Sequence, residues 1–214
     1  MSLLSNQSIA YRYRAEHGRQ CWAGHIYSPD GYSPPRDGLP FALDNGAYTD
    51  FLRERPFDGD RFLRMCDKAS RIEWPALWVV VPDAVADRER TLELWHEWAP
   101  KLKPYKWPLA FAVQDGMTTD DIPRDARVVF VGGSTAWKLR TLRMWCNSFV
   151  RVHIARVNTR ERLQVCFDAG AESIDGTGWW HRSALQLGAM DEYMAAMAQG
   201  RHPFTGVQLE LFQA

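Results

Sequence analysis

The chain has 214 residues, of which 46% are hydrophobic and 24% are charged. This length predicts one domain with a sizeable core, and this composition excludes an intrinsically disordered protein. Lysine and arginine total 26, as do aspartate and glutamate. Because the charges balance, the protein has no overall positive charge with which to attract nucleic acid. Electrostatic binding of nucleic acid would need a local basic face.

Short apolar runs alternate with longer amphipathic segments along the chain. Because the runs are rich in Val, Phe and Ile, they predict strands covered on both faces, and the segments between them predict helices. In chain order the expected strands cover residues 21–27, 40–43, 76–81, 109–113, 127–131, 149–154 and 171–174. The expected helices cover residues 58–72, 85–98, 135–147, 159–169 and 182–199, with Ser134 or Thr135 and Thr159 as candidate N-caps. The turn-forming segment 28–38 is expected to be a surface loop.

The alternation of strands and helices predicts βα units and therefore an α/β fold with a parallel sheet. The sheet would be either open and doubly wound or closed into a barrel. Eight βα units need about 200 residues, so the chain is just long enough for a compact, trimmed (β/α)8 TIM-like barrel. Residues 1–200 would form this single catalytic domain, and residues 201–214 a C-terminal tail.

Polar residues and glycines follow the apolar runs. In a parallel βα fold these positions share one rim, where such folds build their sites. Any one of them is explained equally well as a turn former or helix cap, but the whole series predicts a site with carboxylates for acid–base or nucleophilic chemistry. The series consists of Asp44-Asn-Gly46, Pro82-Asp83, Gln114-Asp-Gly116, Gly132-Gly-Ser134, the group His153, Arg156 and Asn158, and Asp175-Gly-Thr-Gly178.

This series resembles the motifs of the tRNA-guanine transglycosylase superfamily, and it is most similar to the short members that insert 7-deazaguanines into DNA. The matching segments, in order within residues 40–180, are Asp44-Asn-Gly-Ala-Tyr48, Pro82-Asp83, Val113-Gln-Asp-Gly116, Val131-Gly-Gly133 and Ser173-Ile-Asp175. The resemblance implies a (β/α)8 barrel enzyme, a pentosyltransferase that exchanges guanine for a 7-deazaguanine base without breaking the strand. We expect no cofactor and no catalytic metal.

The resemblance also implies roles for individual residues. Asp175 would be the nucleophile that attacks C1′, and Asp44 would handle the proton of the leaving and entering bases. The substrate-binding residues would be Asp83 on the purine N–H edge, Gln114 with the Gly132-Gly133 backbone on the opposite edge, and Tyr48 stacked on the base. His153, Arg156 and Asn158 would shape the pocket or bind phosphate, the alternative being a polar cluster at a strand end.

Some features depart from the tRNA enzymes of this superfamily. Their cysteine-rich zinc motif is absent, and Ser134-Thr-Ala-Trp-Lys138 replaces small apolar residues that end in Glu. The missing zinc motif favours DNA as the partner, with tRNA as the alternative, and the Ser134–Lys138 segment leaves the identity of the incoming base open. The basic residues Lys138, Arg140 and Arg160 are expected to contact the phosphate backbone, although a solvated helix face would have the same composition.

The cysteines are Cys21, Cys66, Cys146 and Cys166, and no two are close enough to form a CxxC pair. We expect reduced thiols, with a structural zinc site as the alternative. No run approaches about 18 unbroken apolar residues, and no secretory signal precedes the first strand, so we expect a cytoplasmic protein with no membrane partner.

The C-terminal segment Gln208-Leu-Glu-Leu-Phe212 is similar to the peptide by which bacterial DNA-associated proteins dock on the sliding clamp. In that mode an extended tail places apolar anchors in a pocket of the partner, here through Gln208, Leu209, Leu211 and Phe212. The alternative is a tail that packs on the core of its own chain. A sliding clamp as partner would link the protein to DNA.

Three other functions remain open. A tRNA-guanine transglycosylase would share the fold and differ in substrate, and a non-catalytic barrel would bind DNA or the clamp without turnover. A metal-dependent hydrolase would use the carboxylates and His153, but no HxH ligand pair is present. A homodimer is one expected assembly, since barrels of this family often pair.

Overall fold

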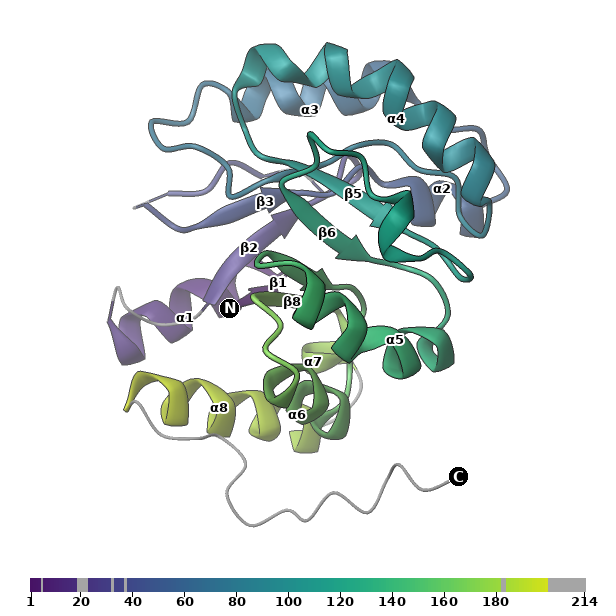
Figure 1. Cartoon of the computed structure of the whole chain (residues 1–214). Helices are drawn as coiled ribbons and strands as arrows, with labels where there is room; N and C mark the ends of the chain where they lie inside the picture. Colours follow the sequence, from purple (N-terminus) through teal and green to yellow (C-terminus); the bar gives the residue numbers. More distant parts are fainter. Residues whose placement is uncertain (5, 19–22, 32, 37, 182–183, 200–214) are drawn as a thin grey trace.

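Eight parallel strands form a closed barrel in the computed structural model, which describes residues 1–4, 6–18, 23–31, 33–36, 38–181 and 184–199. Each strand pairs with the next, and the last strand pairs with the first. The predicted (β/α)8 class is therefore confirmed (Figure 1). The strands are β1 (Ser2–Leu4), β2 (Ala23–Tyr27), β3 (Phe41–Leu43), β4 (Val79–Val80), β5 (Leu109–Val113), β6 (Val128–Val131), β7 (Val152–Ile154) and β8 (Ser173–Gly176).

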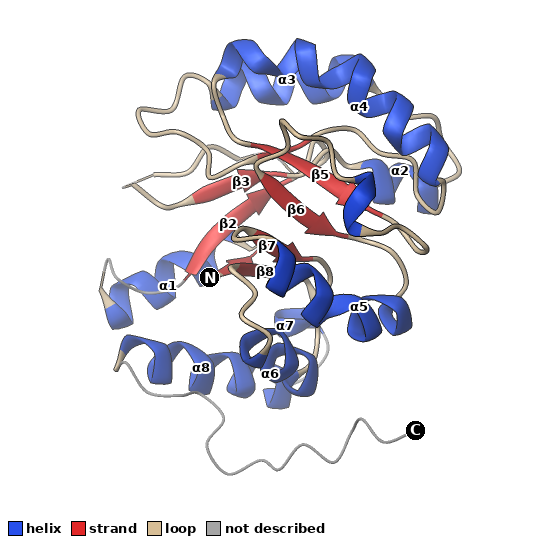
Figure 2. Ribbon diagram, in the orientation of Figure 1, coloured by secondary structure: helices blue, strands red, loops and turns tan. Residues whose placement is uncertain are grey.

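Helices surround the barrel (Figure 2). They are α1 (Gln7–His17), α2 (Ala47–Leu52), α3 (Gly59–Ala69), α4 (Arg88–Leu102), α5 (Thr135–Ser148), α6 (Arg160–Asp168), α7 (Gly178–His181) and α8 (Ala184–Ala198). Two short 3₁₀ turns, η1 (Lys103–Tyr105) and η2 (Thr119–Asp121), complete the list of described helical segments. Between β5 and β6 the chain forms only η2, so the barrel is shortened at this connection.

Side-chain oxygens fix the starts of several helices. The Ser134 hydroxyl accepts from the Trp137 N–H at 3.3 Å, and Thr159 caps α6 in the same way. The α4 helix begins three residues later than predicted, because Asp87 is its N-cap and accepts from the Arg90 N–H at 2.9 Å. Since the Ser134 hydroxyl caps α5, Ser134 and not Thr135 is the observed N-cap of that helix.

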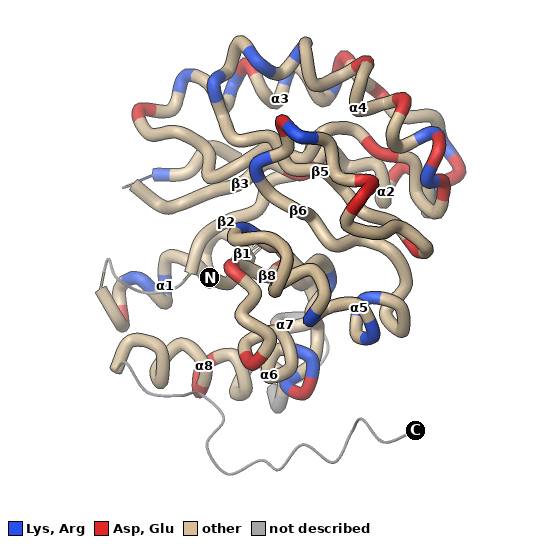
Figure 3. Tube along the Cα trace, viewed as in Figure 1, with Lys and Arg blue, Asp and Glu red and all other residues tan. Residues whose placement is uncertain are grey.

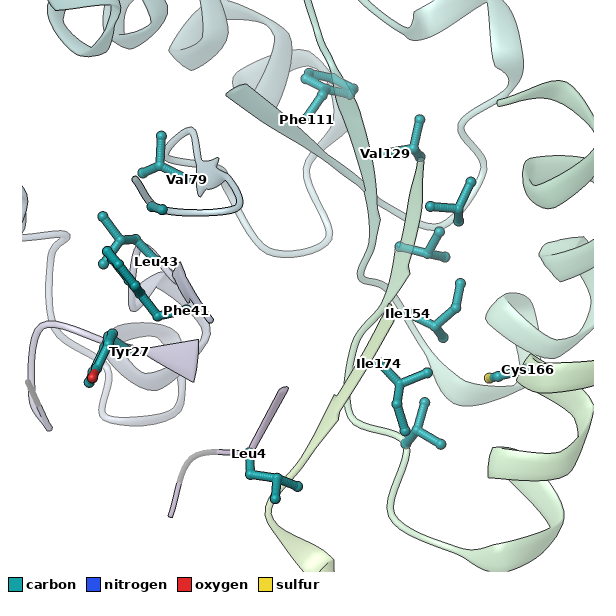
Figure 4. Close-up of a cluster of buried hydrophobic side chains, with 14 of the residues drawn as sticks. Leu4, Tyr27, Phe41, Leu43, Val79, Phe111, Val129, Ile154, Cys166 and Ile174 are labelled. Carbon is teal, nitrogen blue, oxygen red and sulfur yellow. The ribbon is translucent and has the colours of Figure 1, made fainter. Parts of the chain in front are cut away.

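The strands carry their side chains alternately inward and outward. Inside the barrel, Leu3, Ala42, Trp78, Val80, Ala110, Ala112 and Val128 form one buried cluster. Outward-facing residues form the larger cluster against the helices, and Figure 4 shows Ile154 and Ile174 turned toward Cys166 of α6. Asp44 lies two residues after inward-facing Ala42, and Asp175 lies two residues after Ser173. Because side chains alternate along a strand, residues two apart point to the same side. The fold therefore directs both carboxylates toward the barrel axis.

Charged residues of both signs are interspersed on α3 and α4, whereas α8 is almost free of charge (Figure 3). Within α8 the charged residues are Asp191 and Glu192. None of the helices in the described part of the chain is both long enough and apolar enough to cross a membrane.

Candidate active site

A cavity of about 460 Å³ opens at the carboxyl ends of the strands. This volume is in the range of small-molecule sites. Its lining comes from the segments that follow β2 to β8, so residues far apart in sequence meet here, as predicted from the rim positions. The predicted site residues that line it are Asp44, Tyr48, Asp83, Gln114, Gly132, Gly133, Arg156 and Asp175.

Asp175 lies on β8 with both carboxylate oxygens hydrogen-bonded. His153 Nε2 lies 3.1 Å from Oδ2, and the Arg156 backbone N–H donates to Oδ1 at 2.7 Å. Burial works to raise the pKa of Asp175, but these two hydrogen bonds, together with the electrostatic effects of His153 and then of Lys138, outweigh it and hold the pKa below its usual value. Asp175 is therefore an anion at neutral pH, with its oxygens fixed in place.

His153 lies inside the barrel beneath Asp175 and is completely buried. Its ring packs against Trp78 and Phe130, with centroids 4.7 and 5.0 Å away, and its Nδ1 lies 2.8 Å from the Ser173 hydroxyl oxygen. Because an ionised carboxylate only accepts hydrogen bonds, Nε2 must carry the proton directed at Asp175. His153 is thus too deep to bind phosphate, and it orients Asp175 instead.

Asp44 follows β3 and has the most strongly raised pKa of the cavity carboxylates. Burial, and then the negative charges of Asp175 and Asp83, raise its pKa to about 7, against the opposing effect of the nearby Asn45 and Gly46 N–H groups. At neutral pH the carboxyl group is divided between its protonated and ionised forms. Such a group can both donate and accept a proton, which suits general acid–base catalysis.

Asp83 follows β4 and is held between two side-chain amides. Asn45 Nδ2 donates to Oδ1 and Gln114 Nε2 donates to Oδ2, each at 2.7 Å. Burial raises the pKa of Asp83 to about 6, and the two amide hydrogen bonds partly offset this effect. The role of Asn45 is not readable from the sequence, because its side chain meets Asp83 only once the ends of β3 and β4 are adjacent.

Gln114 has a second contact, since its Oε1 accepts from the Ala86 N–H at 3.2 Å. With one amide hydrogen directed at Asp83 and its oxygen at Ala86, Gln114 both lines the cavity and positions a carboxylate. Within the described part of the chain no partner of the remaining amide hydrogen is found.

The Gly132-Gly133 turn has no room for side chains. Gly133 has a φ of 67°, and a Cβ there would lie 2.3 Å from Asp115 Oδ1 and 2.8 Å from the Trp137 ring. Asp115 in turn accepts from the Ser134 N–H and hydroxyl, both at 2.6 Å. Gly133 lines the cavity, and among the described residues no partner of its N–H is found.

Tyr48 stands on α2 at the mouth of the cavity, with 39% of its surface exposed. One face of its ring is covered by the Arg156 guanidinium, whose Cζ lies 4.2 Å from the ring centroid. The same guanidinium donates to the Gly133 carbonyl oxygen. Arg156 therefore braces the aromatic ring against the glycine turn.

Several predicted residues lie elsewhere. Lys138 is buried, and its ammonium donates to the Ala155 carbonyl oxygen, so the predicted phosphate contact is wrong. Asn158 does not line the cavity, because its Oδ1 accepts from the Gly178 N–H at the start of α7.

Arg140 and Arg160 are exposed away from the cavity, and Arg160 pairs with Glu192 at 3.1 Å. The peptide residues Gln208, Leu209, Leu211 and Phe212 lie outside the described residues.

The burial of Lys138 is readable from the sequence in retrospect. Lys138, Leu142 and Trp145 are spaced four and three residues apart on α5, which places them on one helix face, and all three are buried. Composition alone groups Lys138 with the neighbouring basic residues, whereas the helical spacing separates it from them.

In the part of the chain that the structure describes, no three His, Cys, Asp or Glu side chains are grouped closely enough to hold a metal ion. Cys66, Cys146 and Cys166 are free thiols, while Cys21 lies outside the described residues. Burial raises the pKa of Cys66 and of Cys166 to about 12, so these two thiols stay protonated at neutral pH. The reactive groups that line the cavity are its carboxylates.

No family model matches this chain, and a search of curated proteins finds no match. The expected relation to the guanine transglycosylases therefore rests on the rim motifs of the sequence.

Proposed function

We propose that this protein is a base-exchanging pentosyltransferase that replaces guanine in DNA with a 7-deazaguanine. The observation that carries the proposal is the pair Asp175 and Asp44 on one cavity. One is held ionised, and the other has a pKa raised to about 7. Carboxylates whose environments separate their pKa values in this way divide the roles of nucleophile and acid–base group.

In the first half-reaction an Asp175 oxygen attacks C1′ of the target nucleotide. The bond from C1′ to the base breaks, and protonated Asp44 gives its proton to the departing guanine. The product is a covalent ester between Asp175 and the sugar, with the strand intact.

In the second half-reaction the incoming 7-deazaguanine gives a proton to ionised Asp44 and attacks C1′ from the side that guanine left. The C1′–oxygen bond breaks and Asp175 leaves as a carboxylate. Two displacements at one carbon retain the configuration of the sugar, as in retaining glycosidases.

Recognition of the base follows from the other cavity residues. Ionised Asp83 accepts from the N–H edge of a guanine-like base, and the Gly133 N–H donates to an acceptor such as O6. The free face of Tyr48 offers a surface for stacking, which a base extruded from its helix requires. DNA as the substrate, and the C-terminal peptide as a sliding-clamp ligand, rest on the sequence resemblance.

The test is a guanine-exchange assay with purified protein and labelled guanine or 7-deazaguanine. Single-stranded DNA, duplex DNA and bulk tRNA are offered separately. We expect label to enter DNA, and we expect Asp175→Ala to abolish incorporation. A protein–DNA ester that survives denaturation should form with the native chain and not with this variant.

The matched control is Asp120→Asn, which alters an exposed carboxylate outside the cavity and should leave exchange unchanged. Full activity in Asp175→Ala would refute the assignment of Asp175 as the nucleophile. If label enters only tRNA, the substrate is tRNA and not DNA. If label enters none of the nucleic acids, the proposed exchange reaction is refuted.

A further inference from the structure

One peptide group lies between a buried lysine and the proposed nucleophile. The Lys138 ammonium donates to the carbonyl oxygen of Ala155, and the N–H of Arg156 donates to Asp175 Oδ1 at 2.7 Å. This carbonyl and this N–H belong to the same peptide bond, in which they point in opposite directions. Lys138 and Asp175 are thus joined through a single planar, polar unit.

Lys138 is unusual for a lysine because only 4% of its surface is exposed. The groups that influence its ammonium electrostatically are Arg156, Asp175, and Cys166 and Arg162 of α6. Burial, and then the charge of Arg156, lower its pKa to about 8, while Asp175 acts in the opposite direction. Most of the population therefore keeps the positive charge at neutral pH. A buried charge is costly, so its retention calls for a specific function.

The peptide itself is held in an uncommon conformation. Arg156 has a φ of 59°, in the left-handed region that residues other than glycine adopt only when surrounding contacts impose it. Here Lys138 fixes the carbonyl before Arg156, and the Arg156 guanidinium is anchored on Gly133 and Tyr48. These contacts turn the Arg156 N–H toward Asp175.

We propose that Lys138 is a positioning residue for Asp175. Its ammonium fixes and polarises the Ala155–Arg156 peptide, so that the peptide N–H binds one carboxylate oxygen and keeps Asp175 ionised and oriented. Polarisation strengthens the bond, because hydrogen bonds in a chain reinforce one another and those to charged groups are the stronger kind. The effect on Asp175 stands on the geometry alone, and its catalytic consequence rests on the proposed function.

The test uses the full chain and follows the Asp175 carboxyl carbon by NMR as the pH is changed, with Asp175→Asn to assign the signal. In Lys138→Met the pKa of Asp175 should rise by about one unit, the lower range expected when a nearby opposite charge is lost. Lys138→Arg should keep the pKa close to that of the native chain. Arg143→Met removes a charge from the exposed face of the same helix and should not shift it.

Methionine matches lysine in length and is tolerated in buried positions, so we expect Lys138→Met to fold. If it does not fold, Lys138→Gln replaces it, since glutamine keeps a donor for the Ala155 carbonyl without the charge. An unchanged pKa of Asp175 in the folded variants would overturn the proposal.

Kinetics give a second measurement. Lys138→Met should lower kcat for base exchange about tenfold or more, because a reacting group that is less well oriented loses rate, and leave KM nearly unchanged. A rise in KM with kcat unchanged would contradict a positioning role. If the native chain shows no exchange, the proposed function fails, while the NMR titration still decides the role of Lys138.

Discussion

Asp44 and Asp175 are the same residue type on one cavity, yet their surroundings move their pKa values in opposite directions. Asp175 accepts from His153 and from the Arg156 N–H, whereas Asp44 faces the negative charges of Asp175 and Asp83. At the scale of single residues, function is therefore set by the donors and charges around each carboxylate.

The pH profile of base exchange should be bell-shaped. Asp83 must be ionised to accept from the base, and its pKa is about 6. Asp44 must be protonated to release guanine, and its pKa is about 7. We therefore expect kcat/KM to rise as the pH increases through about 6 and to fall above about 7. Rates measured from pH 4 to 9 check this, and a rate that still increases above pH 8 would contradict the role of Asp44.

Replacing Asp44 by asparagine should stabilise the fold at alkaline pH. The folded pKa of Asp44, about 7, lies above the unfolded value of 3.8, so the folded state binds the proton more tightly. Stability from this group is complete below the unfolded pKa and is lost as the pH rises toward 7. Because the carboxylate is partly exposed, we expect a gain of about 1–3 kcal/mol for Asp44→Asn at pH 8 and almost none at pH 4.

Thermal unfolding of the native chain and of Asp44→Asn at pH 4, 6 and 8 measures this difference, with Asp120→Asn as the control for a lost exposed charge. Equal Tm differences at all three values would show that the charge on Asp44 costs the fold nothing.

At the scale of elements, the rim is built from turns that follow strands. The Gly133 turn lines the cavity, and Asp115 closes it onto Ser134 at the start of α5. The turn therefore links β5, β6 and α5 at a single point.

Gly133→Ala should destabilise the protein more than Gly170→Ala. Both glycines have positive φ values, 67° and 82°, but a Cβ at Gly170 meets nothing within 4 Å, whereas one at Gly133 meets Asp115 and Trp137. The left-handed conformation should cost about 1–2 kcal/mol in each variant. The clash should add about 1–3 kcal/mol at Gly133 alone. Urea unfolding of both variants measures the difference, and equal losses would indicate that the turn relaxes without cost.

Much of the fold could be predicted from the sequence, because strands buried on both faces are apolar and end in polar residues. The β5 strand was predicted with its observed limits, 109–113. The β1 strand was missed because three residues carry no periodic signal, and α2 was missed because its six residues are too few to show a helical period. Predicted strand 149–154 starts at Val152, since Phe149 still caps α5.

The candidate site was predictable as a set of rim positions but not as a network. Asp44, Asp83 and Asp175 line one cavity because parallel strands end on the same side. Contacts that depend on the relative rotation of two elements were not predictable. The hydrogen bond from Asn45 to Asp83 is of this kind. The burial of Lys138 is not, because its spacing from Leu142 and Trp145 on α5 indicates a buried helix face.

At the scale of the whole molecule, the closed barrel carries no net charge, and its charges of both signs are interspersed. Of the three basic residues predicted to contact phosphate, Lys138 is buried and Arg160 is paired with Glu192. Binding of nucleic acid should thus depend more on the cavity than on a basic surface.

Binding of single-stranded DNA should therefore respond only weakly to salt. We expect the slope of log Kd against log salt concentration to correspond to about one to three phosphate contacts. Fluorescence anisotropy between about 50 and 200 mM salt measures this slope. A slope typical of six or more contacts would point to a basic surface formed by residues beyond those described.

The packing of Trp78 against His153 gives the barrel an optical consequence. The centre of the indole lies 4.7 Å from that of the His153 ring, and this ring donates to Asp175. A single side chain thus separates Trp78 from the carboxylate that would become an ester. Esterification removes a negative charge there, and indole emission is sensitive to nearby charge. Stopped-flow fluorescence should then follow the chemistry in real time without any dye, and Trp78→Phe would pick out this signal among the ten tryptophans.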